Sequence, residues 1–175
     1  MERPIYKPIG SPVEELDTPA LIVDADILNR NINRIYSFFE GSSALIRPSV
    51  GVHGCPALAH MQLSAPGTVG GISVETLGQA ESFNSSGIKD ISINGLNVTD
   101  QKITRLCALA QNCKITVAVD NIENLKMLSE AAKFSNVSLN TVVDINTGQN
   151  LCGVEPGIPS VNMAIEMEKT ETVNF

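Results

Sequence analysis

The sequence predicts an α/β protein whose parallel strands are joined by helical crossovers. Short apolar segments alternate along the chain with segments whose apolar residues recur at helical spacing, and this alternation is typical of such folds. The apolar segments are continuous runs such as 115–119 (ITVAV), a pattern that indicates strands buried on both faces. Of the 175 residues, 43% are hydrophobic, which is enough for one domain with a sizeable core.

The first predicted elements are an arm, a short strand and a helix. Residues 1–16 are rich in proline and charge and predict an extended N-terminal arm. Residues 20–23 (ALIV) predict a strand, after which Asp24 or Asp26 caps a helix that ends at Gly41. One face of that helix is apolar and carries Leu28, Ile32, Ile35 and Phe39.

Five more strands are predicted after this helix. They lie near 44–50, 68–74, 91–94, 114–119 and 137–145. The helices between them begin at Pro56, at Thr76 with Gln79 as a capping-box pair, at Thr99, and at Asp120 with Glu123. Residues 17–158 are therefore expected to form one (β/α) domain, and the weaker pattern of 159–175 predicts a helix or tail.

Two architectures fit this alternation, an open doubly wound sheet and a (β/α)-barrel. A glycine-rich phosphate loop after the first strand would favour the open sheet, but neither GxGxxG nor GxxxxGK[ST] occurs there. Gly70 and Gly71 lie inside a predicted strand and indicate close packing rather than a phosphate cradle. The pattern favours the barrel and leaves the open sheet as the alternative.

The charge balance argues against two classes of partner. The formal net charge is -7 and no basic cluster occurs, so we expect neither nucleic acid nor an acidic membrane surface to be bound. No apolar run reaches the roughly 18 residues of a membrane span. The N-terminus has no apolar signal region, so we expect a cytoplasmic protein with reduced thiols at Cys55, Cys107, Cys113 and Cys152.

Four stretches, in this order and at this spacing, resemble one enzyme family. They are 16–24 (LDTPALIVD), 46–56 (IRPSVGVHGCP), 74–81 (VETLGQAE) with 86–91 (SGIKDI), and 116–121 (TVAVDN) with 144–154 (DINTGQNLCGV). The chain resembles the N-terminal part of the D-threonine aldolase / D-serine dehydratase family of pyridoxal-phosphate (PLP) enzymes, whose fold type III barrel is shared with alanine racemase. The similarity runs from about Leu16 to Gly157.

The resemblance implies a (β/α)8 barrel followed by a β-domain. Since such a barrel takes about 250 residues, this chain is expected to hold an incomplete one of about five strands, preceded by a short strand and helix. Five strands leave two open sheet edges. We therefore expect an oligomer that closes the incomplete barrel, a rearrangement into an open sheet, or an unstable chain.

The resemblance also implies PLP as cofactor, held as an imine by a lysine at the C-terminal end of the first barrel strand. Gly51 occupies that position here, and Leu151 replaces an arginine. Lys89 and Lys114 precede strands, so they are expected at the opposite end of the barrel. Lysines also occur within predicted helices, at Lys102, Lys126 and Lys133. No catalytic residue is therefore assigned.

Arg47 and His53 are the candidate cofactor-binding residues, because both are retained in the family motif. The resemblance implies that Arg47 orients an active-site group and that His53 contacts a cofactor ring or a substrate. The alternatives are a salt bridge at a strand end and a loop histidine. No metal site is predicted, since His53, Cys55 and His60 lack an apparent fourth ligand. Cys152 is predicted to be a packed thiol.

Three functions remain open at this point. The first is a truncated, inactive relative of the PLP enzymes of D-amino acid metabolism. The second is an active PLP-dependent lyase on D-3-hydroxy amino acids that uses a partner chain or an unforeseen lysine. The third is a non-enzymatic α/β module that binds a small molecule or a protein. The expected ligand is an amino acid or PLP.

Overall fold

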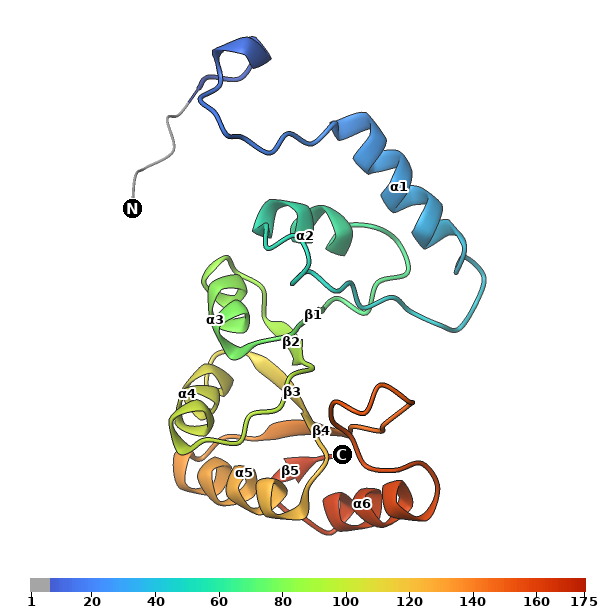
Figure 1. Cartoon of the computed structure of the whole chain (residues 1–175), viewed down its shortest axis with the longest axis vertical. Coiled ribbons are helices and arrows are strands. Elements are labelled where there is room, and N and C mark those ends of the chain that lie inside the picture. The colour runs from blue at the N-terminus through green and yellow to red at the C-terminus, as the bar shows by residue number, and fades with distance from the viewer. Residues whose placement is uncertain (1–6) are drawn as a thin grey trace.

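A computed structural model describes residues 7–175 (Figure 1). A single 3-10 turn, η1 (Val13–Glu15), precedes the helices. The helices are α1 (Ala25–Ser37), α2 (Pro56–Leu63), α3 (Leu77–Ser85), α4 (Asp100–Ala110), α5 (Ile122–Ser135) and α6 (Ile158–Glu168). The strands are β1 (Ile72–Val74), β2 (Asp90–Ile93), β3 (Lys114–Val119), β4 (Leu139–Val143) and β5 (Val173–Asn174).

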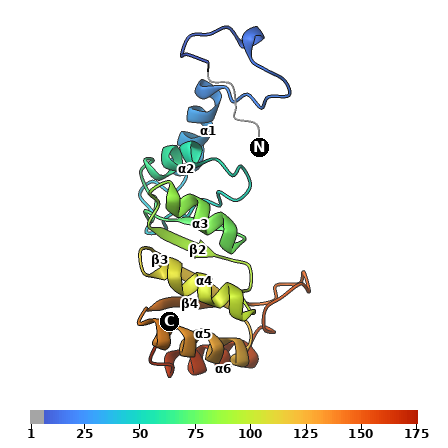
Figure 2. The same ribbon diagram turned by 90° about the vertical axis from the view of Figure 1, so that its left-hand side faces the viewer.

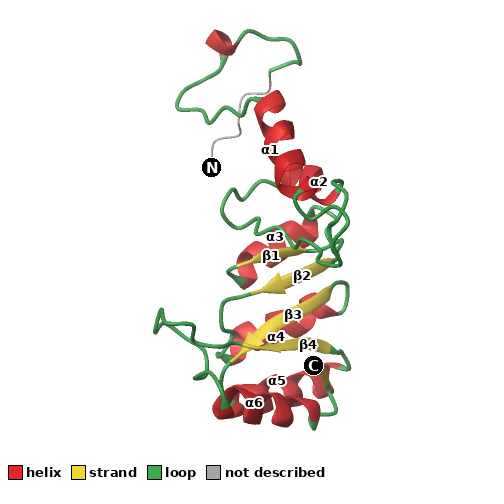
Figure 3. Ribbon diagram, turned by 90° about the vertical axis from the view of Figure 1, so that its right-hand side faces the viewer, coloured by secondary structure: helices red, strands yellow, loops and turns green. Residues whose placement is uncertain are grey.

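The five strands form one parallel sheet in the order β1-β2-β3-β4-β5. Helices α3 to α6 cover one face of this curved sheet, and the other face is open (Figures 1 and 3). The N-terminal arm and α1 lie beyond the α2 end of this stack (Figure 2). The predicted α/β class with an incomplete barrel of parallel strands is confirmed.

Side-chain alternation explains why one face of the sheet is covered and the other is not. Successive strand residues point to opposite faces, and the fully buried Ile91, Ile93 and Val117 pack with residues of the helices in one core. The residues between them, such as Ser92 and Thr116, are only half-buried. The prediction of strands buried on both faces is therefore wrong, because the residues on the open face are mostly small or polar.

The predicted strand at 20–23 is wrong, since these residues are exposed and form no strand. Residues 44–50 are extended but form only isolated bridges, from Ile46 to Thr68 and from Ser49 to Ser73. Pro48 has no N–H to donate to a ladder, which limits pairing there. The fifth strand of the sheet is instead β5, within the segment predicted as a helix or tail. The predicted extended arm falls partly on residues 1–6, which lie outside the described residues.

Most predicted helix starts are confirmed. Asp24 accepts from the Ile27 amide at 2.9 Å at the start of α1, and Thr76 and Gln79 form the expected capping box of α3. Thr99 caps α4 as predicted. Asn121, rather than Asp120, caps α5. The predicted apolar face of α1 is only partly buried: the core contacts come from Ile32 and Tyr36, whereas Ile35 is exposed.

Candidate functional site at the C-terminal edge of the sheet

Parallel strands bring the residues that follow them to one edge of the sheet. Gly51 follows the 46–50 segment, and the residues after β1 to β4 are Glu75, Asn94, Asp120 and Asp144. Strand alternation directs these side chains toward the open face. Active sites of (β/α)-barrels lie at this edge, so it is the candidate site. Sequence reasoning missed Glu75, Asn94 and Asp120, although the first polar residue after each predicted strand was a usable signal.

Three of the side chains at this edge are carboxylates: Glu75, Asp120 and Asp144. Asn94 Nδ2 donates to Glu75 Oε1 at 3.3 Å. Asp120 Oδ2 accepts from the Gly153 amide at 2.9 Å, which fixes the loop after β4 against the end of β3. The edge therefore offers oxygen acceptors and negative charge. It suits an ammonium group better than a carboxylate or phosphate.

Gly51 leaves a gap at this edge that Gln79 partly fills. A Cβ at position 51 would lie 3.1 Å from Gln79 Oε1 and 3.3 Å from Gln79 Nε2. Gln79 Nε2 also donates to the Gly51 carbonyl at 3.4 Å. Gln79 is held there because its Oε1 accepts from the amides of Glu75 and Thr76. A Cβ at position 51 therefore requires the Gln79 side chain to move by a few tenths of an ångström.

Within residues 7–175, no lysine directly follows a strand at this edge. Lys114 begins β3, and its Nζ lies 3.3 Å from Asp90 Oδ2 at the N-terminal end of the strands. Lys89 precedes β2 and donates to Asn84 at 3.1 Å. The remaining lysines lie in the arm, in α4 and α5, or just after α6, at Lys7, Lys102, Lys126, Lys133 and Lys169. The predicted positions of Lys89 and Lys114 are confirmed.

Arg47 lies at the opposite, N-terminal edge of the sheet. Its Nη1 donates to Asp90 Oδ1 at 2.6 Å and to the Ile72 carbonyl at 3.2 Å. Asp90 begins β2 and is shared with Lys114. The predicted close packing at Gly71 is also found here, because a Cβ on Gly71 would collide with Arg47 and Asp90. The ion pair corresponds to the alternative interpretation of Arg47, and a cofactor contact remains a prediction.

His53 lies two residues beyond Gly51 and supports the loop that leads into α2. Its Nδ1 accepts from the Cys55 amide at 3.1 Å, so Nε2 carries the proton and donates to Gln62 Oε1 at 3.1 Å. His60 Nε2 donates to the Ser86 carbonyl at 3.0 Å. Among residues 7–175, no three His, Cys, Asp or Glu side chains gather in a way that could hold a metal ion.

Cys152 is exposed, so the prediction of a packed thiol is wrong. It lies in the loop after β4, whose shape depends on Gly153: φ is +93° there, and a Cβ would collide with the Asn146 backbone. A hydrogen bond to Asp144 raises the pKa of the Cys152 thiol, and burial and the charge of Asp144 act in the same direction. Since the thiolate is the reactive form, the raised pKa lowers the share of reactive thiolate at neutral pH. Leu151 is 83% exposed beside it.

The fold and this edge together define an open α/β half-barrel. Its candidate site carries carboxylates, and no lysine directly follows a described strand. Residues 23–175 match the family model described as alanine racemase, N-terminal domain. The chain belongs to this family, which confirms the resemblance on which the site was assigned. No helix within residues 7–175 has the length and apolar character needed to cross a membrane.

Two curated relatives of this chain are aldolases. The chain is 30% identical over 166 residues to the D-threonine aldolase of Arthrobacter sp., covering 95% of this chain and 43% of that protein. It is 32% identical over 146 residues to the 3-hydroxy-D-aspartate aldolase of Paracoccus denitrificans, covering 83% of this chain and 38% of the relative. The chain therefore spans less than half the length of these relatives.

A solved structure supports the same assignment. The crystal structure of D-threonine aldolase from Filomicrobium marinum superposes with a TM-score of 0.88 at 33% identity. The match covers 93% of this chain and 43% of that structure. The backbone arrangement described above is thus that of the corresponding part of an aldolase of this family.

Proposed function

We propose that this chain is a non-catalytic member of the PLP-dependent D-threonine aldolase branch, derived from enzymes of D-amino acid metabolism. One observation carries the proposal: Gly51 follows the first extended segment at the position where the family resemblance implies the imine-forming lysine. PLP requires an amine there. The surrounding residues do not fit the cofactor, because none of the residues that directly follow β1 to β4 within residues 7–175 is a lysine, and three of them are carboxylates.

The ligand class follows from the same branch. The relatives' names refer to D-threonine and 3-hydroxy-D-aspartate, so a D-3-hydroxy amino acid is the expected ligand of the candidate site. Glu75, Asp120 and Asp144 suit its ammonium group. Of the two residues predicted to bind the cofactor, His53 is proposed to contact this ligand instead, because it lies two residues beyond Gly51. Arg47 lies at the opposite edge, where it pairs with Asp90.

A partner chain is the second part of the proposal. Within the described residues, the 46–50 segment and β5 each have a strand neighbour on one side only. Unpaired sheet edges favour association, so an oligomer that completes the sheet is expected. If a partner supplies a lysine, the alternative function is an active lyase. All four cysteines are free thiols, which supports a cytoplasmic location.

The experiment is a PLP titration of the purified chain followed by absorbance. The proposal expects no saturable band near about 420 nm, the region of a PLP imine. The matched control is Gly51→Lys, which adds an amine at this position and whose Cβ would meet the Gln79 side chain. A saturable band in the wild-type chain would contradict the proposal and favour the lyase.

A further inference from the structure

Helix α6 has an apolar face that is turned away from the core. Its buried face enters the core through residues such as Met163. Ile158, Val161 and Ile165 recur at helical spacing on the other side of the helix, and all three are exposed. Val161, Ile165 and Phe175 line a largely apolar surface groove of about 450 Å³. An exposed apolar groove of this kind indicates an interaction surface.

Helix α1 also exposes apolar side chains on one face. On its buried face, Ile32 packs in one cluster with Met61 of α2. Helical spacing places Ile27, Arg34 and Phe38 together on a face turned away from that cluster. All three are exposed, and Phe38 is 82% exposed. This face of α1 is therefore a second candidate interaction surface.

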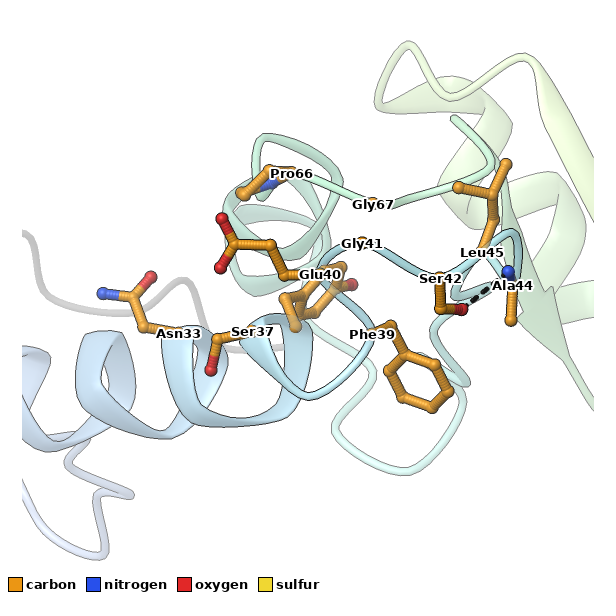
Figure 4. Close-up of a pocket in the computed structure, with 11 residues that line it drawn as sticks. Asn33, Ser37, Phe39, Glu40, Gly41, Ser42, Ala44, Leu45, Pro66 and Gly67 are labelled. Atoms are coloured by element: carbon orange, nitrogen blue, oxygen red, sulfur yellow. Dashed lines mark hydrogen bonds between the residues drawn. The ribbon is translucent and has the colours of Figure 1, made fainter.

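The two surfaces lie at opposite ends of the molecule (Figures 1 and 2). A short turn joins α1 to the first extended segment, and in this turn Ser42 Oγ accepts from the Ala44 amide at 2.8 Å (Figure 4). A short turn likewise joins α6 to β5. Each surface thus stands beside one outer strand of the sheet. The two surfaces cannot meet within one chain, whereas they can meet between two copies in a head-to-tail contact.

The two surfaces carry opposite charges. Arg30 and Arg34, the arginine pair, lie one turn apart on α1 and are exposed. Glu168 lines the groove and Glu171 follows α6 at an exposed position; they form the glutamate pair. Within residues 7–175 none of these four side chains forms an ion pair. Lys169 also lines the groove, but it is already paired with a glutamate of α6 at 2.9 Å. Charge complementarity therefore favours α1 of a second copy as the occupant of the groove.

The open face of the sheet argues against the alternative of face-to-face association. Strand register places Ser73, Ser92, Thr116 and Asn140 in one row across neighbouring strands, on the face that the helices leave open. Sheets that pack face to face bury apolar side chains between them. A polar row has no such side chains to bury, so contact between the ends of the molecule is favoured.

We propose that a second copy of this chain seats its α1 in the groove beside α6, with the arginine pair against the glutamate pair and Phe38 against the apolar wall. The inference rests on the oligomer of the proposed function and names the surfaces that form it. It is independent of the missing amine at Gly51. Because each surface stands beside an outer strand, the contact brings the 46–50 segment of one copy toward β5 of the other.

Charge reversal tests this contact by sedimentation velocity over a range of protein concentrations. One double variant is Arg30→Glu with Arg34→Glu, and the other is Glu168→Arg with Glu171→Arg. Each places like charges against each other, so we expect self-association to be at least about tenfold weaker than in the wild type. An equimolar mixture of the two variants should associate like the wild type, because every contact between them again joins opposite charges.

Matched controls come from α5. Lys126→Glu with Lys133→Glu changes the net charge as much as the arginine variant does, at exposed positions, and should associate like the wild type. Phe38→Ser tests the apolar part of the contact and should weaken association. Phe134→Ser, which changes another exposed phenylalanine, should not. Circular dichroism shows whether each variant is folded, and if a charge variant is not, the two phenylalanine variants decide.

The outcomes that would overturn the inference are distinct. A wild-type monomer at every concentration would mean that the groove has another occupant, and it would also remove the oligomer of the proposed function. Association that is unchanged in the double variants and in Phe38→Ser would place the oligomer on another surface. Weaker association without recovery in the mixture, or equal weakening by the lysine control, would show that the arginine and glutamate pairs do not face each other. None of these outcomes bears on PLP binding, which the titration tests separately.

Discussion

Single residues at the two ends of the strands have different roles. At the C-terminal edge Gly51 removes the amine that the family chemistry requires, and at the N-terminal edge Arg47 and Lys114 neutralise Asp90. The motif containing Arg47 was recognisable from the sequence. Its place was not, because only the contacts with Asp90 and the Ile72 carbonyl show that Arg47 lies at the edge opposite Gly51.

Arg47→Met should destabilise the chain by about 1–2 kcal/mol, because the half-buried Asp90 would keep only Lys114 as a charged partner. Urea unfolding measures the change. The control is Arg105→Met, which breaks a more exposed pair with Glu81 and should cost less than about 1 kcal/mol. Equal effects of the two substitutions would show that the Arg47 pair has no special structural role.

Cys152 should react slowly with iodoacetamide near neutral pH, because Asp144 raises the pKa of its thiol and so lowers the thiolate fraction. Asp144→Asn removes the carboxylate, lowers that pKa and should speed alkylation several-fold at a pH below the pKa. Mass analysis of peptides separates Cys152 from the half-buried Cys55. An unchanged rate in Asp144→Asn would contradict the assigned interaction.

At the scale of elements, the junction of β1 and α3 controls the surroundings of Gly51. The capping box positions Gln79, and Gln79 in turn reaches the Gly51 carbonyl. This junction was predicted from the sequence because both capping residues and their spacing are local features. The cap of α5 was placed one residue early, since Asp120 and Asn121 are both good capping residues. Asn121 Oδ1 accepts from the Glu123 and Asn124 amides, whereas Asp120 accepts from Gly153.

Thr76→Ala should destabilise the chain by about 1 kcal/mol, because the Gln79 amide loses its acceptor. Hydrogen exchange should show faster opening at the start of α3 than in the wild type. Thr172→Ala is the control, because Thr172 lies between α6 and β5 and caps no helix. It should leave hydrogen exchange at the start of α3 unchanged. If both substitutions affect α3 alike, the capping box does not stabilise it.

Elements that depend on distant partners were the ones the sequence did not predict correctly. Residues 20–23 have strand-like composition but no neighbour to pair with among the described residues, so they stay extended and exposed. β5 has only two residues, which is too short for a periodic signal, and it is a strand because Leu139 and Asn140 pair with it. Pairing of this kind cannot be deduced from a local pattern.

For the whole molecule, the open sheet is the feature with the largest consequence. Its outer edges, the 46–50 segment and β5, present unpaired backbone groups. Sedimentation velocity should therefore show a species heavier than one chain, with a fraction that rises with protein concentration. A single monomeric species at all concentrations, together with cooperative unfolding, would show that the chain is stable with its sheet open.

The central claim is that no residue of this chain forms an imine with PLP, and borohydride reduction tests it most directly. The chain is mixed with an equal concentration of PLP, reduced, digested and mapped by mass spectrometry, with Gly51→Lys in parallel. The account predicts only scattered, substoichiometric labels in the wild type and a label at position 51 in the variant. A stoichiometric label at one wild-type lysine would contradict the account and identify the residue that takes the place of the missing amine.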